Sequence, residues 1–520
     1  MSGFEELLTV LLIAVLLAAI ARRVGAPYPA FLALGGAVLA FLPGAPAFSI
    51  DPEVALALFV APVLLDAAYD SSPRDLQDYW APIVSLAVGT VVMTTVAAAL
   101  VSRALVPSMP WAAAIALGAI VSPPDAAAAT AVLRQLRPPH RILTILEGES
   151  LFNDASALLI YRLAIGAVAM KAFSLRTVAP TILLVVAGSV VAGPILAWLF
   201  FRLTIKVQDV RTSVILQFIS TFGVWILSDR IGLSSVLTMV SYAITIAQWA
   251  PGRIPARIRI PSYAVWDVTV FVLNVLAFVF IGLQVRPVLR GLPSGMRAHY
   301  LSIAVAVLLT SIAVRILWVM THNTIARWRI RRFGFHPRRP MQPPTLGSGI
   351  VVSWAGMRGI VSLAAAFALP EDFPFRGVIV LTAFAVVLGT LVLQGLTLRP
   401  LIRLLNLPDD DPVGREVEIA RQRAVEAALA TLDGDTSPAA EAVRHELAAH
   451  LARSDGDAEA GSESAHEEIH RRAIQAARRV VLEMRTNGSI GDDAFHRLEE
   501  EFDWLEMGSG AGADPADVSG

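Results

Sequence analysis

The sequence contains no cysteine, and only 16% of its 520 residues are charged. The lack of cysteine excludes disulfide bonds and thiol chemistry. Charged residues make up about 25% of a typical soluble domain, so this chain has too few of them to cover a soluble surface. A formal net charge of −1 also argues against nucleic acid as a partner. Instead, 55% of the residues are hydrophobic and the mean hydropathy is +0.63, which is typical of a multi-pass membrane protein.

Long apolar runs recur along the chain as far as residue 405. Each has roughly the 17–25 residues that a helix needs to cross about 30 Å of hydrocarbon. The first run ends in Arg22-Arg23 and has no basic residues before it, so it predicts a transmembrane helix and not a signal peptide. We expect thirteen spans, at approximately 5–21, 28–44, 53–69, 80–104, 110–133, 142–169, 177–201, 212–228, 232–249, 264–285, 300–320, 347–369 and 377–402.

Arginine and lysine are distributed unequally over the loops between these spans. The loops that follow odd-numbered spans carry most of them. Because the cytoplasmic loops of membrane proteins are enriched in basic residues, we expect the odd-numbered loops in the cytoplasm. This predicts a plasma (inner) membrane protein whose N-terminus lies outside and whose C-terminal segment lies in the cytoplasm.

The character of the sequence changes at about residue 408, where Asp409-Asp410-Asp411 opens a polar region. We therefore predict a transmembrane domain over 1–407, a helical cytoplasmic tail over 408–507 and a disordered C-terminus over 508–520, which is rich in small and polar residues. The tail either packs on the membrane domain or on itself, or it has a regulatory role, and no motif decides between these readings. The predicted fold is thus an all-α polytopic membrane protein with a helical tail.

An acidic run interrupts one of the apolar spans, with the sequence Leu146-Glu147-Gly148-Glu149-Ser150-Leu151-Phe152-Asn153-Asp154. A carboxylate in hydrocarbon is costly unless it is paired, lines a water-filled path or binds a cation. On a helix, Ser150 and Asp154 are four residues apart and share a face. They would offer hydroxyl and carboxylate oxygens, the ligands that a hard monovalent cation prefers. Alternatively, Ser150 and Asn153 only join helices through hydrogen bonds.

The segment Ser122-Pro123-Pro124-Asp125 lies inside another apolar span. Two prolines remove backbone donors and break the helical hydrogen-bond ladder, which leaves free carbonyl groups in mid-membrane. Transporters use such broken helices at their ion sites. Asp125 then lies beside an unwound turn, or it caps the second half of the helix, and both can hold together.

Arg358 lies between glycines in the run Trp354–Gly359 of a further span. An arginine on an apolar helix needs a carboxylate or carbonyl partner, for which Glu147 and Glu149 are the candidates. We favour a structural pair over direct contact with an ion. Asp66 belongs either to an ion path or to the membrane interface. The remaining polar residues within the spans include Arg315, Asp267 and Asn274.

These motifs resemble those of the monovalent cation:proton antiporters of the bacterial NhaP and animal NHE type. Gly148–Asp154 is similar to the family signature Gly-Glu-Ser-Leu-x-Asn-Asp, and Gly356–Gly359 is similar to its Gly-Leu-Arg-Gly motif. The Asp125 segment resembles the unwound Ser-Pro-Thr-Asp-Pro helix, except that Pro124 replaces the threonine and Ala126 replaces the final proline. A threonine hydroxyl is therefore missing, while the Pro124 carbonyl remains. The resemblance covers roughly residues 5–405.

The resemblance implies a homodimer in which each protomer has a dimerisation domain and a six-helix core, with inverted repeats and two unwound helices that cross near the ion site. It implies that Asp154 binds either the cation or the proton. For the remaining residues it implies that Asp125, Ser150 and the Pro124 carbonyl help to ligate the cation, that Asn153 steadies the crossing, that Glu149 and Arg358 form a structural pair, and that Asp66 lies on the approach.

The expected function is secondary active transport, in which a monovalent cation, sodium before potassium, exchanges for a proton by alternating access. An Asn153-Asp154 pair in place of two adjacent aspartates favours one proton per cation and hence electroneutral exchange. The alternative is a cation channel or a proton-linked membrane sensor, although the proline-broken helix favours alternating access. The sequence has no metal-ligand spacing, nucleophile–base arrangement or phosphate loop, so we expect neither an enzyme nor a cofactor.

Overall fold

The computed structural model describes residues 2–24, 27–42, 51–136, 138–170, 175–207, 209–250, 253–290, 296–334, 343–407 and 412–434, and scattered residues between 437 and 498. Regular structure in this described part is helical throughout, which confirms the predicted all-α class. The chain divides into two compact units, Met1–Asp410 and Asp411–Gly520. The predicted boundary at residue 407 remains a prediction, and most of the predicted tail, with the whole of 508–520, lies outside the described residues.

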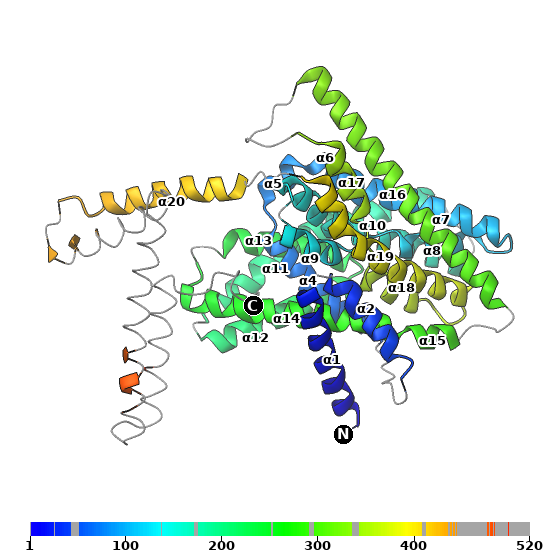
Figure 1. Cartoon of the computed structure of the whole chain (residues 1–520), viewed down its shortest axis with the longest axis horizontal. Helices are drawn as coiled ribbons and strands as arrows, with labels where there is room; N and C mark the ends of the chain where they lie inside the picture. The colour runs from blue at the N-terminus through cyan, green and yellow to red at the C-terminus, as the bar shows by residue number, and fades with distance from the viewer. Residues whose placement is uncertain are drawn as a thin grey trace. The chain divides into compact units, whose positions relative to one another are not determined.

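The first unit is a bundle of helices (Figure 1). Its N-terminal half contains α1 (Ser2–Val24), α2 (Tyr28–Leu39), α3 (Pro52–Ala55), η1 (Leu56–Val60), α4 (Ala61–Asp70), α5 (Pro73–Asp78), α6 (Trp80–Val84), η2 (Ser85–Thr90), α7 (Val91–Leu105), α8 (Trp111–Val121), α9 (Ala126–Leu136) and α10 (His140–Met170). Its C-terminal half contains α11 (Leu175–Thr204), α12 (Val210–Arg230), α13 (Ser235–Trp249), α14 (Ala256–Leu283), α15 (Val285–Arg290), α16 (Arg297–Phe333), α17 (Leu346–Trp354), α18 (Ile360–Phe367) and α19 (Arg376–Leu405). The second unit contains α20 (Pro412–Ala430).

Eight helical stretches of the described residues are long and apolar enough to cross a membrane, by length and composition. Shorter apolar helices occur at Tyr28–Leu39, Trp111–Val121 and Ser235–Trp249. The eight stretches are Pro52–Asp70, Trp80–Leu105, His140–Val168, Pro180–Thr204, Val210–Arg230, Arg257–Arg290, Ala298–Phe333 and Arg376–Leu405.

Polar side chains at the helix ends explain several of the observed boundaries. Asp51 accepts hydrogen bonds from the backbone of α3, and Ser72 does so at α5. Asp209 accepts a hydrogen bond of 2.8 Å from the Thr212 backbone N–H and so begins α12. These hydrogen bonds from Thr212 lower the pKa of the Asp209 carboxyl, because they favour its ionised form.

Small residues let two of the helices approach closely. A side chain at Gly282 of α14 would meet the backbone of α2, and a side chain at Gly36 of α2 would meet the backbone of α14. Close backbone approach at small residues is the usual basis of helix packing in membranes. The buried core of the unit includes most of α8, and α10 and α19 also contribute to it.

Two apolar segments are interrupted in mid-course. The first interruption separates α8 from α9 at residues 122–125, where Pro123 and Pro124 cannot donate backbone hydrogen bonds. The second separates α17 from α18 at residues 355–359, which include Gly356 and Gly359. The predicted break at Pro123-Pro124 is therefore present, whereas the break at residues 355–359 lies in a run that was expected to be helical.

Candidate ion site

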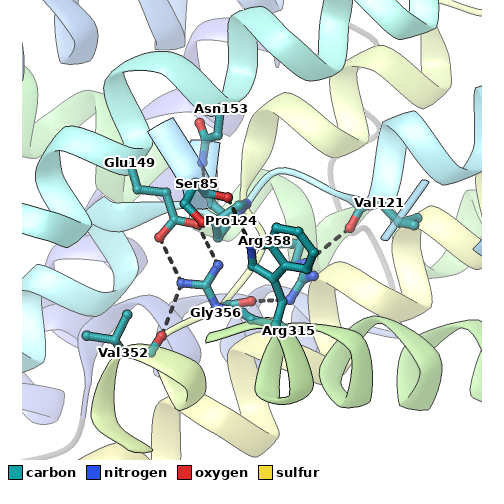
Figure 2. A network of polar contacts seen from close by, with 10 residues as sticks. Ser85, Val121, Pro124, Glu149, Asn153, Arg315, Val352, Gly356 and Arg358 are labelled. Carbon is teal, nitrogen blue, oxygen red and sulfur yellow. Dashed lines mark hydrogen bonds and ion pairs between the residues drawn. The ribbon is translucent and has the colours of Figure 1, made fainter. Parts of the chain in front are cut away.

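The two interruptions are joined to each other by hydrogen bonds. The Asp125 backbone N–H donates to the Met357 carbonyl oxygen at 2.6 Å. In the opposite direction, the Arg358 Nε donates to the Val121 carbonyl oxygen at 3.1 Å (Figure 2). Two segments more than 200 residues apart in the chain are thus joined by hydrogen bonds to backbone carbonyl groups that the helix breaks leave free. Four helix ends meet at this place, those of α8, α9, α17 and α18.

The carboxylate of Asp125 lies at the beginning of two of these helices. Its Oδ1 accepts a hydrogen bond of 2.9 Å from the Ala127 backbone N–H in the first turn of α9. A Cβ atom added at Gly359, the residue before α18, would collide with the same carboxylate. Helix N-termini carry partial positive charge, so both helices stabilise the negative charge of Asp125. The N-cap role considered for Asp125 is therefore present.

The guanidinium of Arg358 lies at the C-terminal ends of α8 and α17, as the Asp125 carboxylate lies at the N-terminal ends of α9 and α18. It is fully buried and donates to the carbonyl oxygen of Val121, the last residue of α8. It also donates to the carbonyl oxygen of Gly356, just beyond α17, and the Arg358 backbone N–H donates to the Thr390 Oγ1 at 3.0 Å. Helix C-termini carry partial negative charge, so Arg358 stabilises two helix ends that would otherwise lack partners.

Asn153 joins α10 to the first interruption. Its Nδ2 donates to the Pro124 carbonyl oxygen at 2.7 Å, and the side chain is completely buried (Figure 2). Its Oδ1 is buried and has no hydrogen-bond partner among the described residues. Asn153 therefore fixes the backbone next to Asp125 and leaves one amide oxygen available.

A cavity of about 310 Å³ lies beside the interruptions. Asp154 lines this cavity, is only 8% exposed, and accepts no hydrogen bond and forms no ion pair within the described residues. A buried carboxylate without partners is costly unless it is protonated or binds a cation. Asp154 therefore has the surroundings of a group that exchanges one kind of positive charge for another. The other predicted site residues that line the cavity are Asp66, Pro124, Asp125 and Ser150.

The predicted pair of Glu149 with Arg358 is wrong. Glu149 instead accepts two hydrogen bonds from Arg315 of α16, at 2.6 and 2.9 Å, and both side chains are buried (Figure 2). Arg315 also donates to the Val352 carbonyl oxygen at 3.1 Å. The helix interruption accounts for this difference, because its free carbonyl groups accept hydrogen bonds from Arg358 while Glu149 pairs with the other buried arginine.

Sequence reasoning also missed residues that line the cavity. Glu147 lies three residues before Ser150 and seven before Asp154, a spacing that places all three on one face of α10. This periodicity was available in the sequence and could have identified Glu147. The partner of Glu149 was not, because it depends on how α16 packs against α10. Within the described residues, no three His, Cys, Asp or Glu side chains converge as a metal-binding group.

A protein-family model described as the transmembrane sodium/hydrogen exchanger matches residues 9–404. The chain belongs to the sodium/hydrogen exchanger family. The match confirms the family to which the motifs pointed. It includes both interruptions and the whole of the candidate ion site of this exchanger.

Similar proteins agree with this assignment. A Mycobacterium bovis protein named an uncharacterized Na⁺/H⁺ exchanger is 32% identical over 95% of this chain and 93% of its own length. A Bacillus subtilis sodium, potassium, lithium and rubidium/H⁺ antiporter is 28% identical over 92% of this chain and 74% of its own length. The solved structure of the sodium proton antiporter MjNhaP1 from Methanocaldococcus jannaschii matches with a TM-score of 0.57 at 18% identity, over 78% of this chain and 100% of that chain, which shows a shared fold.

Proposed function

We propose that this exchanger moves a monovalent cation and a proton in opposite directions through competition for the Asp154 carboxylate. Cation/proton exchange follows from the family and its antiporter relatives. The observation that supports the assignment to Asp154 is its position, buried and unpartnered on the wall of a cavity. Asp125, Ser150 and the Pro124 carbonyl are proposed to complete the oxygen ligands, with Asn153 holding the Pro124 backbone in place.

The charges around the site favour electroneutral exchange. Arg315 and Arg358 are buried cations, and Glu149 and Asp125 are carboxylates stabilised by Arg315 and by two helix N-termini respectively. These four charges cancel when Asp154 is protonated. They cancel again when Asp154 is ionised and holds one monovalent cation. This group of four charges together with Asp154 is thus neutral with either load, while it is not neutral when Asp154 is ionised and empty, and burial of net charge is costly.

We propose alternating access as the mode of transport. In this proposal the two interrupted helices cross at the site within thirteen spans arranged as inverted repeats, and the neutral core moves relative to a dimerisation domain in a homodimer. The hydrogen bonds between the two interruptions support this arrangement, because they connect the ends of α8, α9, α17 and α18 to one another. The N-terminus is proposed to lie outside and the tail in the cytoplasm of the plasma membrane.

Sodium is proposed as the principal cation and potassium as a second substrate. The Bacillus subtilis relative is named for sodium, potassium, lithium and rubidium, which supports a site of broad monovalent selectivity. The proline at position 124 fits this view. It removes one hydroxyl ligand while its carbonyl remains on the cavity wall.

Exchange in proteoliposomes tests this function. With an internal pH dye, an imposed pH gradient and a clamped membrane potential, we expect added sodium or potassium to collapse the gradient. Asp154→Asn should abolish the response, because an amide cannot take up a proton or balance a cation. Asp229→Asn is the matched control, since Asp229 pairs with Arg162 at an exposed position.

Two results would contradict the proposal. Full exchange by Asp154→Asn would remove that carboxylate from the mechanism. Sodium flux that proceeds without proton movement, at rates far above those of a transporter, would instead indicate a channel.

A further inference from the structure

A second cavity of about 400 Å³ adjoins the cavity of the ion site. Aromatic residues of α11 and α14, among them Phe200 and Trp266, line it. Four charged residues line both cavities: Asp66, Asp70, Arg134 and Asp267. The two cavities therefore share one charged rim, and Arg134 lies on it with three carboxylates.

Among the residues that the structure describes, Arg134 is the one basic residue on the wall of the ion-site cavity. It lies in the last turn of α9, and its Nη2 contacts the Glu147 Oε1 of α10 at 3.1 Å. The Arg134 side chain is 66% exposed and that of Glu147 is 32% exposed. Exposed ion pairs of this kind contribute little to stability, so an ion from solution can replace the guanidinium at low cost.

Glu147 shares its helix face with the proposed cation ligands. Ser150 lies one turn further along α10 and Asp154 two turns further, and all three line the cavity. Seven residues of helix correspond to about 10 Å. On the face of α10 that lines the cavity, the Arg134–Glu147 pair is thus the next charged position after Asp154.

We infer that Arg134 is a tethered competitor of the transported cation, which it keeps from Glu147 until the incoming ion displaces it. This inference rests on the proposed exchange at Asp154. The guanidinium occupies a carboxylate on the cavity wall that lies one helix turn before Ser150 and two turns before Asp154. Its charge also lowers the cation concentration at the rim. Arg134 is therefore a residue that sets the apparent affinity for the cation and does not take part in the exchange at Asp154.

The test is the cation dependence of exchange in proteoliposomes for Arg134→Gln, Arg134→Lys and wild type. For a charge at about 10 Å in a partly aqueous cavity, we expect Arg134→Gln to lower the KM for sodium about two- to fivefold. kcat should stay within about twofold, because Asp154 and its neighbours are unchanged. Arg134→Lys, which keeps the charge, should resemble wild type. Added N-methylglucamine chloride should reduce the difference in KM by screening.

The substitution Glu147→Gln changes the charge of the pair in the direction opposite to Arg134→Gln. It removes the negative charge and leaves Arg134 unpaired at the rim, so the KM for sodium should rise. The double variant Arg134→Gln/Glu147→Gln has the wild-type net charge at the rim and should lie between the two single variants.

An unchanged or higher KM in Arg134→Gln would overturn the inference, as would a loss confined to kcat, which indicates a structural role for the pair. These outcomes leave the proposed function intact, because wild type would still exchange and Asp154→Asn would not. If wild type itself shows no exchange, both proposals fall.

Discussion

In this exchanger, each buried charged side chain is stabilised by its own set of partners. Arg315 and Glu149 form two hydrogen bonds with each other, whereas Arg358 donates to carbonyl groups at helix ends. Replacing a buried ion pair by apolar residues is often neutral, but removing one partner leaves an unpaired charge in a low dielectric. The decrease in the free energy of unfolding on removal of a buried charge therefore depends on the partner of that charge.

Arg315→Met should destabilise the protein by about 3–5 kcal/mol, because Glu149 would remain buried without its partner. The measurement is thermal unfolding of the purified protein in detergent. Arg162→Met is the matched control, because Arg162 and Asp229 form an exposed pair worth at most about 1 kcal/mol. The double variant Arg315→Met/Glu149→Leu should recover much of the loss. Equal stability of Arg315→Met and Arg162→Met would show that the buried pair is not needed.

At the scale of elements, the meeting of four helix ends is the feature on which the site depends. Asp125 compensates two N-termini and Arg358 two C-termini, so one carboxylate and one guanidinium stabilise both interruptions. The space between the interruptions is filled, as the contact of Gly359 with the Asp125 carboxylate shows. Glycine is required there because of this close approach.

Gly359→Ala should therefore reduce exchange by at least about tenfold, because its Cβ would displace the Asp125 carboxylate from the helix ends. A cost of about 1–3 kcal/mol in stability is expected from the overpacking. Sodium-dependent exchange in proteoliposomes measures the first effect and thermal unfolding the second. Gly377→Ala is the control, since a Cβ atom at Gly377 in α19 meets nothing within 4 Å. Normal exchange by Gly359→Ala would show that this contact does not position Asp125.

Across the whole molecule, local sequence patterns predicted the helical elements better than they predicted which side chains pair between those elements. The proline pair at 123–124 predicted the first interruption, because proline cannot donate a backbone hydrogen bond. The residues around Arg358 did not predict the second, and the family resemblance implied a second unwound helix without assigning it to residues 355–359. The cavity residues Asp154, Asp125 and Ser150 were predicted from the cost of carboxylates in an apolar span and from the family resemblance.

The pairing of Glu149 with Arg315 could not be predicted in the same way. It joins positions 166 residues apart, and the choice between two buried arginines depends on which of them the packing of the helices brings to Glu149. The sequence does show Arg315 as a charged residue inside an apolar span, which indicates that it needs a partner. Only the packing of α16 against the core identified that partner.

The central claim is that a cation and a proton compete for Asp154. Its most direct test is proton release on cation binding, measured by calorimetry on purified protein in buffers of different ionisation enthalpy, at a pH where the site is protonated. The account predicts a proton released for each sodium ion bound, and neither binding nor release in Asp154→Asn. Sodium binding without proton release, or unchanged release in Asp154→Asn, would contradict it.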